Sequence, residues 1–192
     1  MLAIESAPAM RRAARIPALA VAVVAAVAAV AASGCSSTQD DLSVAEGAPV
    51  ALGNLEYNVQ ISRFLNPSDA EDQSYLQGAP ALPSDDYYLG VFLTVDNKGQ
   101  SKSSLPTRYD VTDTQHNAYA PVPVDNGFAL PLGGEVPAQR RIPNPDSIAA
   151  NAPIGGLMLL FLIPESSTEN RPLTLKIPAA GNAAPARIQL DI

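Results

Sequence analysis

The chain has 192 residues, a formal charge of −7, 47% hydrophobic residues, one cysteine and one histidine. A single cysteine excludes an internal disulfide, and the excess of acid argues against nucleic acid as a partner and against electrostatic attraction to an anionic membrane. Without residues 1–34, nine basic and eighteen acidic residues remain, giving a formal charge of −9 on a length that suits one domain plus a tether.

Residues 1–34 have the pattern of an export signal. Three arginines between positions 11 and 15 form a basic segment, and the 17 residues 16–32 are apolar, almost all Ala and Val. Positive charge retains the N-terminus in the cytoplasm while a short apolar helix partitions into the bilayer. An uncleaved transmembrane helix needs about 20 strongly apolar residues, so it remains an alternative, as does an ordinary secretory signal. Met10 would start a more conventional signal than Met1, and both remain candidate start residues.

The signal ends in Ala32-Ser33-Gly34-Cys35, which resembles the lipobox of bacterial lipoprotein precursors. In that family the cysteine thiol receives a diacylglyceryl group, and the signal is then cleaved before the cysteine. The resemblance implies cleavage between Gly34 and Cys35 and a membrane anchor on Cys35. Ala32 departs from the family pattern, in which Leu is most frequent. We therefore expect the protein to be lipid-anchored at the cell membrane on its extracytoplasmic side, in the periplasm or at the cell exterior.

Residues 36–48 are rich in Ser, Asp and small residues and have no apolar period. We therefore expect a lipidated N-terminus and a flexible tether over residues 35–48. A random coil of this length spans on the order of 20 Å, which would keep the domain close to its bilayer.

From Pro49 onward, Pro and Gly separate short apolar alternations, the pattern of an all-β sandwich or barrel. The first alternation predicts a half-buried strand, with one face formed by Leu55, Tyr57, Val59 and Ile61 and the other by Glu56, Asn58, Gln60 and Ser62. A second alternation over residues 87–95 also carries three aromatic side chains and predicts a central strand, which ends at the turn residues 97–99.

The rest of the chain predicts further strands. Residues 109–113 and 118–120 flank a polar tetrapeptide and predict a hairpin. Residues 155–163 are continuously apolar, which fits a strand covered on both faces. Two further alternations lie at residues 173–177 and 188–192. With weak strands near Val50 or Val122, we expect about seven or eight strands in all.

The order of these segments resembles a known domain. The resemblance rests on residues 89–99, on 109–113, on 155–164 and on 172–177. Together they are similar to the telokin-like, immunoglobulin-type domain of bacterial lipoproteins and secreted proteins, including the mycobacterial immunoprotective secreted antigen. The resemblance implies an immunoglobulin-like antiparallel β-sandwich over residues 49–192 and implies no established activity.

Two stretches, residues 66–86 and 129–154, do not read as strands. The first is acidic, and the second is rich in Pro and Gly. Long irregular loops on a rigid sandwich often carry function, although drift on an exposed surface produces them equally.

Catalytic and metal-binding signals are weak. His116 is the only histidine and lies between Gln115 and Asn117 in the predicted hairpin loop, which suits a solvated turn residue. A hydrolase would require His116 to meet a serine and a carboxylate in space. A transition-metal site normally needs several His or Cys ligands. We therefore expect no catalytic residues, no metal and no cofactor.

Calcium is the one ion for which the sequence offers ligands. Asp110 and Asp113 could combine with further acids, namely Asp96, Asp125 or the pair Asp85 and Asp86. The spacing matches no EF-hand loop. Strand alternation also sends Asp110 and Asp113 to opposite faces unless a bulge intervenes. The tyrosines are expected to divide between core and interface rather than to form a ligand box: Tyr75, Tyr87, Tyr88, Tyr109 and Tyr119.

The sequence therefore predicts a non-enzymatic lipoprotein of the cell envelope. We expect its domain to act as an interaction module that contacts an envelope protein through sheet edges or through the loops 66–86 and 129–154. A binder of a small ligand, a glycan or calcium is the alternative, and a hydrolase is a third hypothesis.

Overall fold

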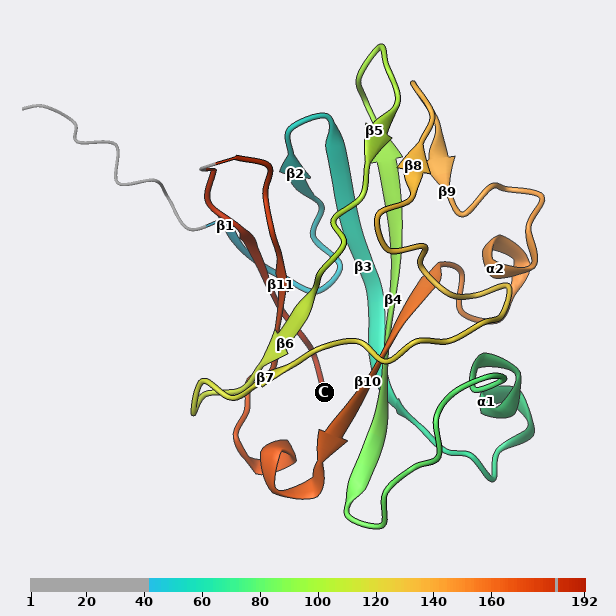
Figure 1. Cartoon of the computed structure of the whole chain (residues 1–192), viewed down its shortest axis with the longest axis vertical. Coiled ribbons are helices and arrows are strands. Elements are labelled where there is room, and N and C mark those ends of the chain that lie inside the picture. Colours follow the sequence, from blue (N-terminus) through green and yellow to red (C-terminus); the bar gives the residue numbers. More distant parts are fainter. Residues whose placement is uncertain (1–41, 182) are drawn as a thin grey trace, which may run out of the picture. The chain divides into compact units, whose positions relative to one another are not determined.

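The computed structural model describes residues 42–181 and 183–192 (Figure 1). The predicted signal, its cleavage site and Cys35 lie outside the described residues. The strands are β1 (Leu42–Ala45), β2 (Val50–Leu52), β3 (Leu55–Leu65), β4 (Asp86–Asn97), β5 (Ser103–Ser104), β6 (Asp110–Thr112), β7 (Ala118–Tyr119), β8 (Glu135–Val136), β9 (Arg141–Ile142), β10 (Leu157–Pro164), β11 (Thr174–Ile177) and β12 (Ala186–Gln189). The helices are α1 (Ala70–Tyr75), α2 (Ile148–Asn151) and the 3₁₀ helix η1 (Glu165–Glu169).

Two sheets form the sandwich. The first has the order β1-β12-β11-β6-β7, and the second has the order β10-β4-β3-β2 with β9 also paired to β4. Their facing sides enclose one apolar core, to which β3, β4 and β10 contribute from one sheet and β6, β11 and β12 from the other. The expected all-β sandwich is confirmed. Its pairing is antiparallel except that β1 runs parallel to β12.

β4 is the central strand of the second sheet. It pairs with β3 on one side and with β10 on the other. Leu89, Val91 and Leu93 are buried in the core between the sheets, whereas Phe92 is buried in a second cluster on the opposite face. The aromatic-rich alternation therefore marked a central strand, as expected, and the structure adds that both of its faces are buried.

A bulge in β3 corrects the predicted alternation. Leu55, Tyr57 and Val59 are buried as expected, but the pairing with β4 shifts between Val59 and Ile61. An extra residue in one strand reverses the faces of the side chains that follow. Ile61 is therefore 38% exposed and Ser62 only 3% exposed, the opposite of the prediction.

β10 is an edge strand in the sheet order, yet it is buried on both faces as predicted. Residues 121–130 run along its open edge. Val122 N–H donates to Leu160 C=O at 2.7 Å, and Leu130 N–H donates to Met158 C=O at 2.9 Å. The weak strand expected near Val122 amounts to a single bridge between Pro121 and Phe161, whereas the one near Val50 is β2.

Residues 66–86, expected as an irregular loop, fold onto the outer face of the second sheet. The Asp69 carboxylate accepts hydrogen bonds from the N–H groups of Glu71 and Asp72 and so caps α1. Tyr75 at the end of α1 is fully buried against Phe92 and Phe128. The stretch is therefore part of a second apolar layer.

Residues 42–48, expected as the end of the flexible tether, instead belong to the folded domain. β1 pairs with β12 in the register Leu42 to Ala186 through Ala45 to Gln189. Val44 packs against the core. β1 is an edge strand held by backbone pairing, and only one of its side chains points inward. Such a strand has almost no apolar alternation, which is why the sequence did not reveal β1.

Among the described residues, no helix is long and apolar enough to cross a membrane.

Candidate functional site

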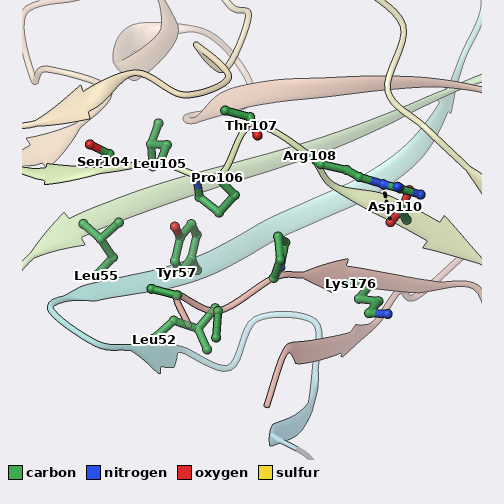
Figure 2. Close-up of a pocket in the computed structure, with 13 residues that line it drawn as sticks. Leu52, Leu55, Tyr57, Ser104, Leu105, Pro106, Thr107, Arg108, Asp110 and Lys176 are labelled. Carbon is green, nitrogen blue, oxygen red and sulfur yellow. Dashed lines mark hydrogen bonds and ion pairs between the residues drawn. The ribbon is translucent and has the colours of Figure 1, made fainter. Parts of the chain in front are cut away.

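The first sheet opens at one end, between β6 and β11. These strands pair from Thr112 and Thr174 to Asp110 and Lys176, and no pair follows. Beyond that point residues 104–109 and 177–180 separate, and a groove of about 660 Å³ lies between them (Figure 2). The lining residues are Leu52, Leu55, Tyr57, Ser104, Leu105, Pro106, Thr107, Arg108, Asp110, Lys176, Pro178, Ala179 and Ala180.

The floor of the groove is the inner face of the second sheet. The alternation of β3 turns Leu55 and Tyr57 inward, and Leu52 extends the floor from β2. Figure 2 shows the Tyr57 ring with its hydroxyl directed toward Pro106. The floor is therefore apolar, and its side chains Leu55 and Tyr57 are themselves buried, at 5% and 1% exposed.

Free backbone borders the groove on both sides. Leu105 N–H donates to Gly134 C=O at 2.7 Å, and Gly133 N–H donates to Pro106 C=O at 2.9 Å, so the loop 133–134 holds the first half of one flank. Within the described part of the chain, no backbone hydrogen bond is formed by Thr107 or by residues 178–180. Both flanks therefore offer unpaired peptide groups.

Two buried phenols lie at this end of the core. Burial raises the pKa of Tyr57 to about 12, with an opposing contribution from the Tyr109 side chain. Burial, followed by the nearby Tyr57 phenol, raises the pKa of Tyr109 as well. Both groups are neutral at physiological pH and leave the floor without charge.

The charged residues of the groove lie at the end of the β6–β11 ladder. Arg108 Nε donates to both carboxylate oxygens of Asp110, at 3.1 and 3.2 Å. Lys176 is the register partner of Asp110 across the ladder, but no salt bridge of Lys176 is present among the described residues. One lysine of the groove is therefore left without a carboxylate.

The acids considered for calcium are not brought together. Asp110 is paired with Arg108, and Asp96 accepts from Arg141 at 2.9 Å. Asp113 is buried within the hairpin that was expected at residues 109–120, whose strands are β6 and β7. Asp85 and Asp86 line a separate acidic surface depression beside η1. The described residues contain no group of three or more His, Cys, Asp or Glu side chains that could hold a metal ion.

His116 is exposed at the tip of this hairpin, in the left-handed backbone region at φ 66°. Its backbone N–H donates to Asp113 C=O at 3.1 Å. Among the described residues, its imidazole forms no hydrogen bond to a serine or a carboxylate, so the arrangement that a hydrolase needs is not formed at this histidine.

Some of the tyrosines expected in the core are buried, and one lies at the surface. Tyr75 and Tyr109 are fully buried and Tyr88 nearly so, whereas Tyr87 is 41% exposed. None of the five predicted tyrosines lines the groove; Tyr57 does. Sequence reasoning placed Tyr57 in a strand but missed the groove, and the only local signal was Lys176, a lone base within an apolar alternation.

No family model matches this chain, and no curated protein matches it. Similar solved structures include an uncharacterised β-sandwich protein from Clostridium difficile 630, which is 13% identical with a TM-score of 0.47 over 79% of this chain and 95% of that one. The yjhA protein of Bacillus subtilis is 14% identical with a TM-score of 0.49, over 77% and 99% of the two chains. A candidate lipoprotein of Bacillus subtilis, ycdA, is 12% identical with a TM-score of 0.46, over 77% of this chain and 38% of its own.

Proposed function

We propose that this protein is a non-enzymatic lipoprotein held at the extracytoplasmic face of the cell membrane by a lipidated Cys35, and that its groove binds an extended segment of another envelope protein. The observation that carries the proposal is the opening between residues 104–109 and 177–180. It combines an apolar floor with unpaired backbone on both flanks.

An extended peptide suits this geometry better than a globular surface does. Peptides that add to a sheet gain affinity from main-chain hydrogen bonds and specificity from pockets for alternate side chains. Thr107 and Ala179 supply peptide groups without partners, and Leu52, Leu55 and Tyr57 supply an apolar base. The bound segment would lie between the chain segments that precede β6 and follow β11, where these two strands no longer pair.

The anchor is supported by the lipobox resemblance of Ala32-Ser33-Gly34-Cys35. The resemblance of the domain to the telokin-like family implies no established activity, so the interaction role rests on the groove. Cys35→Ala should abolish labelling by palmitate and move the protein from the membrane fraction to the soluble fraction. Labelling that persists in the Cys35→Ala variant would exclude the anchor.

The interaction is tested by crosslinking in cells that contain the lipidated protein. A photoreactive amino acid is placed at Thr107 on the groove and, as a matched control, at Ser166 on η1; both positions are exposed. We expect one dominant partner from position 107, absent from position 166 and weakened in the Cys35→Ala background. Equal patterns from both positions, or adducts from position 166 alone, would remove the groove from the proposal.

A small ligand is the second candidate, because about 660 Å³ lies within the usual range for ligand pockets of roughly 300 to 1,000 Å³. Native mass spectrometry of protein purified from cells distinguishes the two. A bound mass of a few hundred daltons that is lost when Ala179 is replaced by Trp would favour the ligand, whereas a protein adduct at position 107 favours the segment.

A further inference from the structure

Building on the proposed function, we infer that the segment bound in the groove carries a carboxylate beside apolar side chains, and that Lys176 binds this carboxylate. Lys176 lies where the paired part of the first sheet ends and the groove begins. Lys176 lines the groove, and so does Pro178, two residues further along the chain. A ligand that enters between the flanks therefore meets this lysine at the closed end of the opening.

The acid that faces Lys176 in the sheet is already engaged. Asp110 is its register partner on β6, but both oxygens of Asp110 accept from Arg108. Two bases thus share one carboxylate at this end of the groove, and the local charge is positive. A positive site on a domain whose formal charge is strongly negative selects an anionic partner by electrostatic complementarity.

Lys176 differs from most other bases of the domain. Among the described residues, five bases form salt bridges: Arg63 with Asp72, Lys98 with Glu56, Lys102 with Glu135, Arg108 with Asp110 and Arg141 with Asp96. Lys176 is less exposed than Lys98 and Lys102, since it is half-buried. A half-buried ammonium without a carboxylate gains most from an anion delivered by a ligand, because solvent screens the new pair less than it screens a surface pair.

The floor of the groove determines which side chains the bound segment should carry beside its carboxylate. Leu52, Leu55 and the uncharged Tyr57 ring offer apolar contacts. An ammonium is a compact charge on a flexible stem and tolerates several approach directions. The preferred segment is therefore an extended one in which an Asp, a Glu or a terminal carboxylate adjoins aliphatic residues.

The test uses the full-length lipidated protein in detergent and a phage library of random 12-residue peptides. Peptides count as groove-dependent when they bind the wild type but neither Ala179→Trp nor Thr107→Trp, two variants that fill the groove from opposite flanks. We expect groove-dependent peptides to be enriched in Asp or Glu beside aliphatic residues. Selection on Lys176→Glu should replace this acid by Lys or Arg.

The interaction between Lys176 and the peptide carboxylate is measured with two peptides. One is a selected peptide, and the other carries a carboxamide in place of its carboxylate. Lys176→Met, which keeps the aliphatic stem, should weaken the acidic peptide at least tenfold and leave the carboxamide peptide unchanged. Arg140→Met, on an exposed base of the β8–β9 turn, should change neither. Thermal unfolding confirms that each variant is folded.

The outcomes separate the two proposals. Groove-dependent peptides without acid enrichment, bound equally by Lys176→Met, would overturn the inference and leave the groove as a peptide site. If no peptide is groove-dependent, the proposed function fails, and the inference fails with it.

Discussion

Asp113 shows how a single buried carboxylate can organise a loop. It is 5% exposed, and it accepts hydrogen bonds from the N–H groups of Gln115 and Asn117 and from the Asn117 side chain, each at 2.9 Å. Burial by itself raises its pKa, but the hydrogen bonds from Asn117 and Gln115, and one involving Asn170, hold the pKa below the usual range. The residue considered as a calcium ligand is therefore the cap of the β6–β7 hairpin.

Replacing Asp113 by Asn should lower the free energy of unfolding at pH 7 by about 1–3 kcal/mol, because an amide NH₂ would face the Asn117 amide and the Tyr119 hydroxyl. A carboxyl group with a lowered folded-state pKa stabilises the fold above its unfolded pKa, about 3.9, and loses this contribution as the pH falls through the folded value. The difference between the two proteins should therefore narrow from pH 5 to pH 3 in urea unfolding. Asp125→Asn, at an exposed position, serves as the control and should stay within about 0.5 kcal/mol.

Gly156 is required by the backbone at the start of β10. Its φ is 153°, and a Cβ would lie 3.1 Å from Leu93 N and 3.2 Å from Leu93 O. Gly156→Ala should destabilise the protein by roughly 1–3 kcal/mol in thermal unfolding. Gly155→Ala is the matched control, since its nearest contact would be an ordinary 3.5 Å to Ala150 O. Equal effects of the two substitutions would contradict this explanation.

At the scale of elements, the residue that follows β1 is hydrogen-bonded to the bulged part of β3. Glu46, directly after β1, accepts hydrogen bonds from Ser62 N–H at 2.9 Å and from Asp191 N–H at 3.1 Å, and its other contact is the Ser62 hydroxyl. One carboxylate thus joins the bulge to the C-terminal segment.

Val44 distinguishes a strand from a tether. Val44→Asp should lower the free energy of unfolding by about 1–3 kcal/mol, because the charge would replace a side chain packed on the core. Ser43→Asp, at the exposed neighbouring position of β1, should stay within about 0.5 kcal/mol. Denaturant unfolding measures both. Two neutral substitutions would mean that residues 42–48 behave as a tether after all.

At the scale of the molecule, the second sheet is shared between two apolar layers. Its inner face meets the first sheet, and its outer face is covered by α1 and by apolar side chains of residues 122–128 and 152–154. This arrangement leaves the groove as an opening in the first sheet alone. The stretch 66–86 packs on this outer face through Tyr75, Leu76 and Leu82, and its role as a recognition surface stays a prediction.

Tyr75 measures how much that second layer stabilises the domain. Its ring is 5.0 Å from Phe92 and 4.7 Å from Phe128 between centroids. Tyr75→Ala should cost about 3–5 kcal/mol in guanidinium unfolding, the usual loss for a large buried aromatic. Gln77→Ala, exposed on the same segment, should be nearly neutral. A loss under about 1 kcal/mol for Tyr75→Ala would show that the segment is only loosely attached.

The sequence by itself determined the fold class, the central strand and the strands at residues 157–164 and 174–177. Strands buried on one or two faces have a local hydrophobic pattern that can be recognised in the sequence. The resemblance of residues 32–35 to a lipobox, and with it the lipidation of Cys35, stays a prediction from the sequence. Only the tertiary structure decided that β1 joins the fold, that the bulge reverses Ile61 and Ser62, and that β6 and β11 part to expose the groove. Each of these depends on pairing between segments distant in the chain, for which local periodicity holds no information.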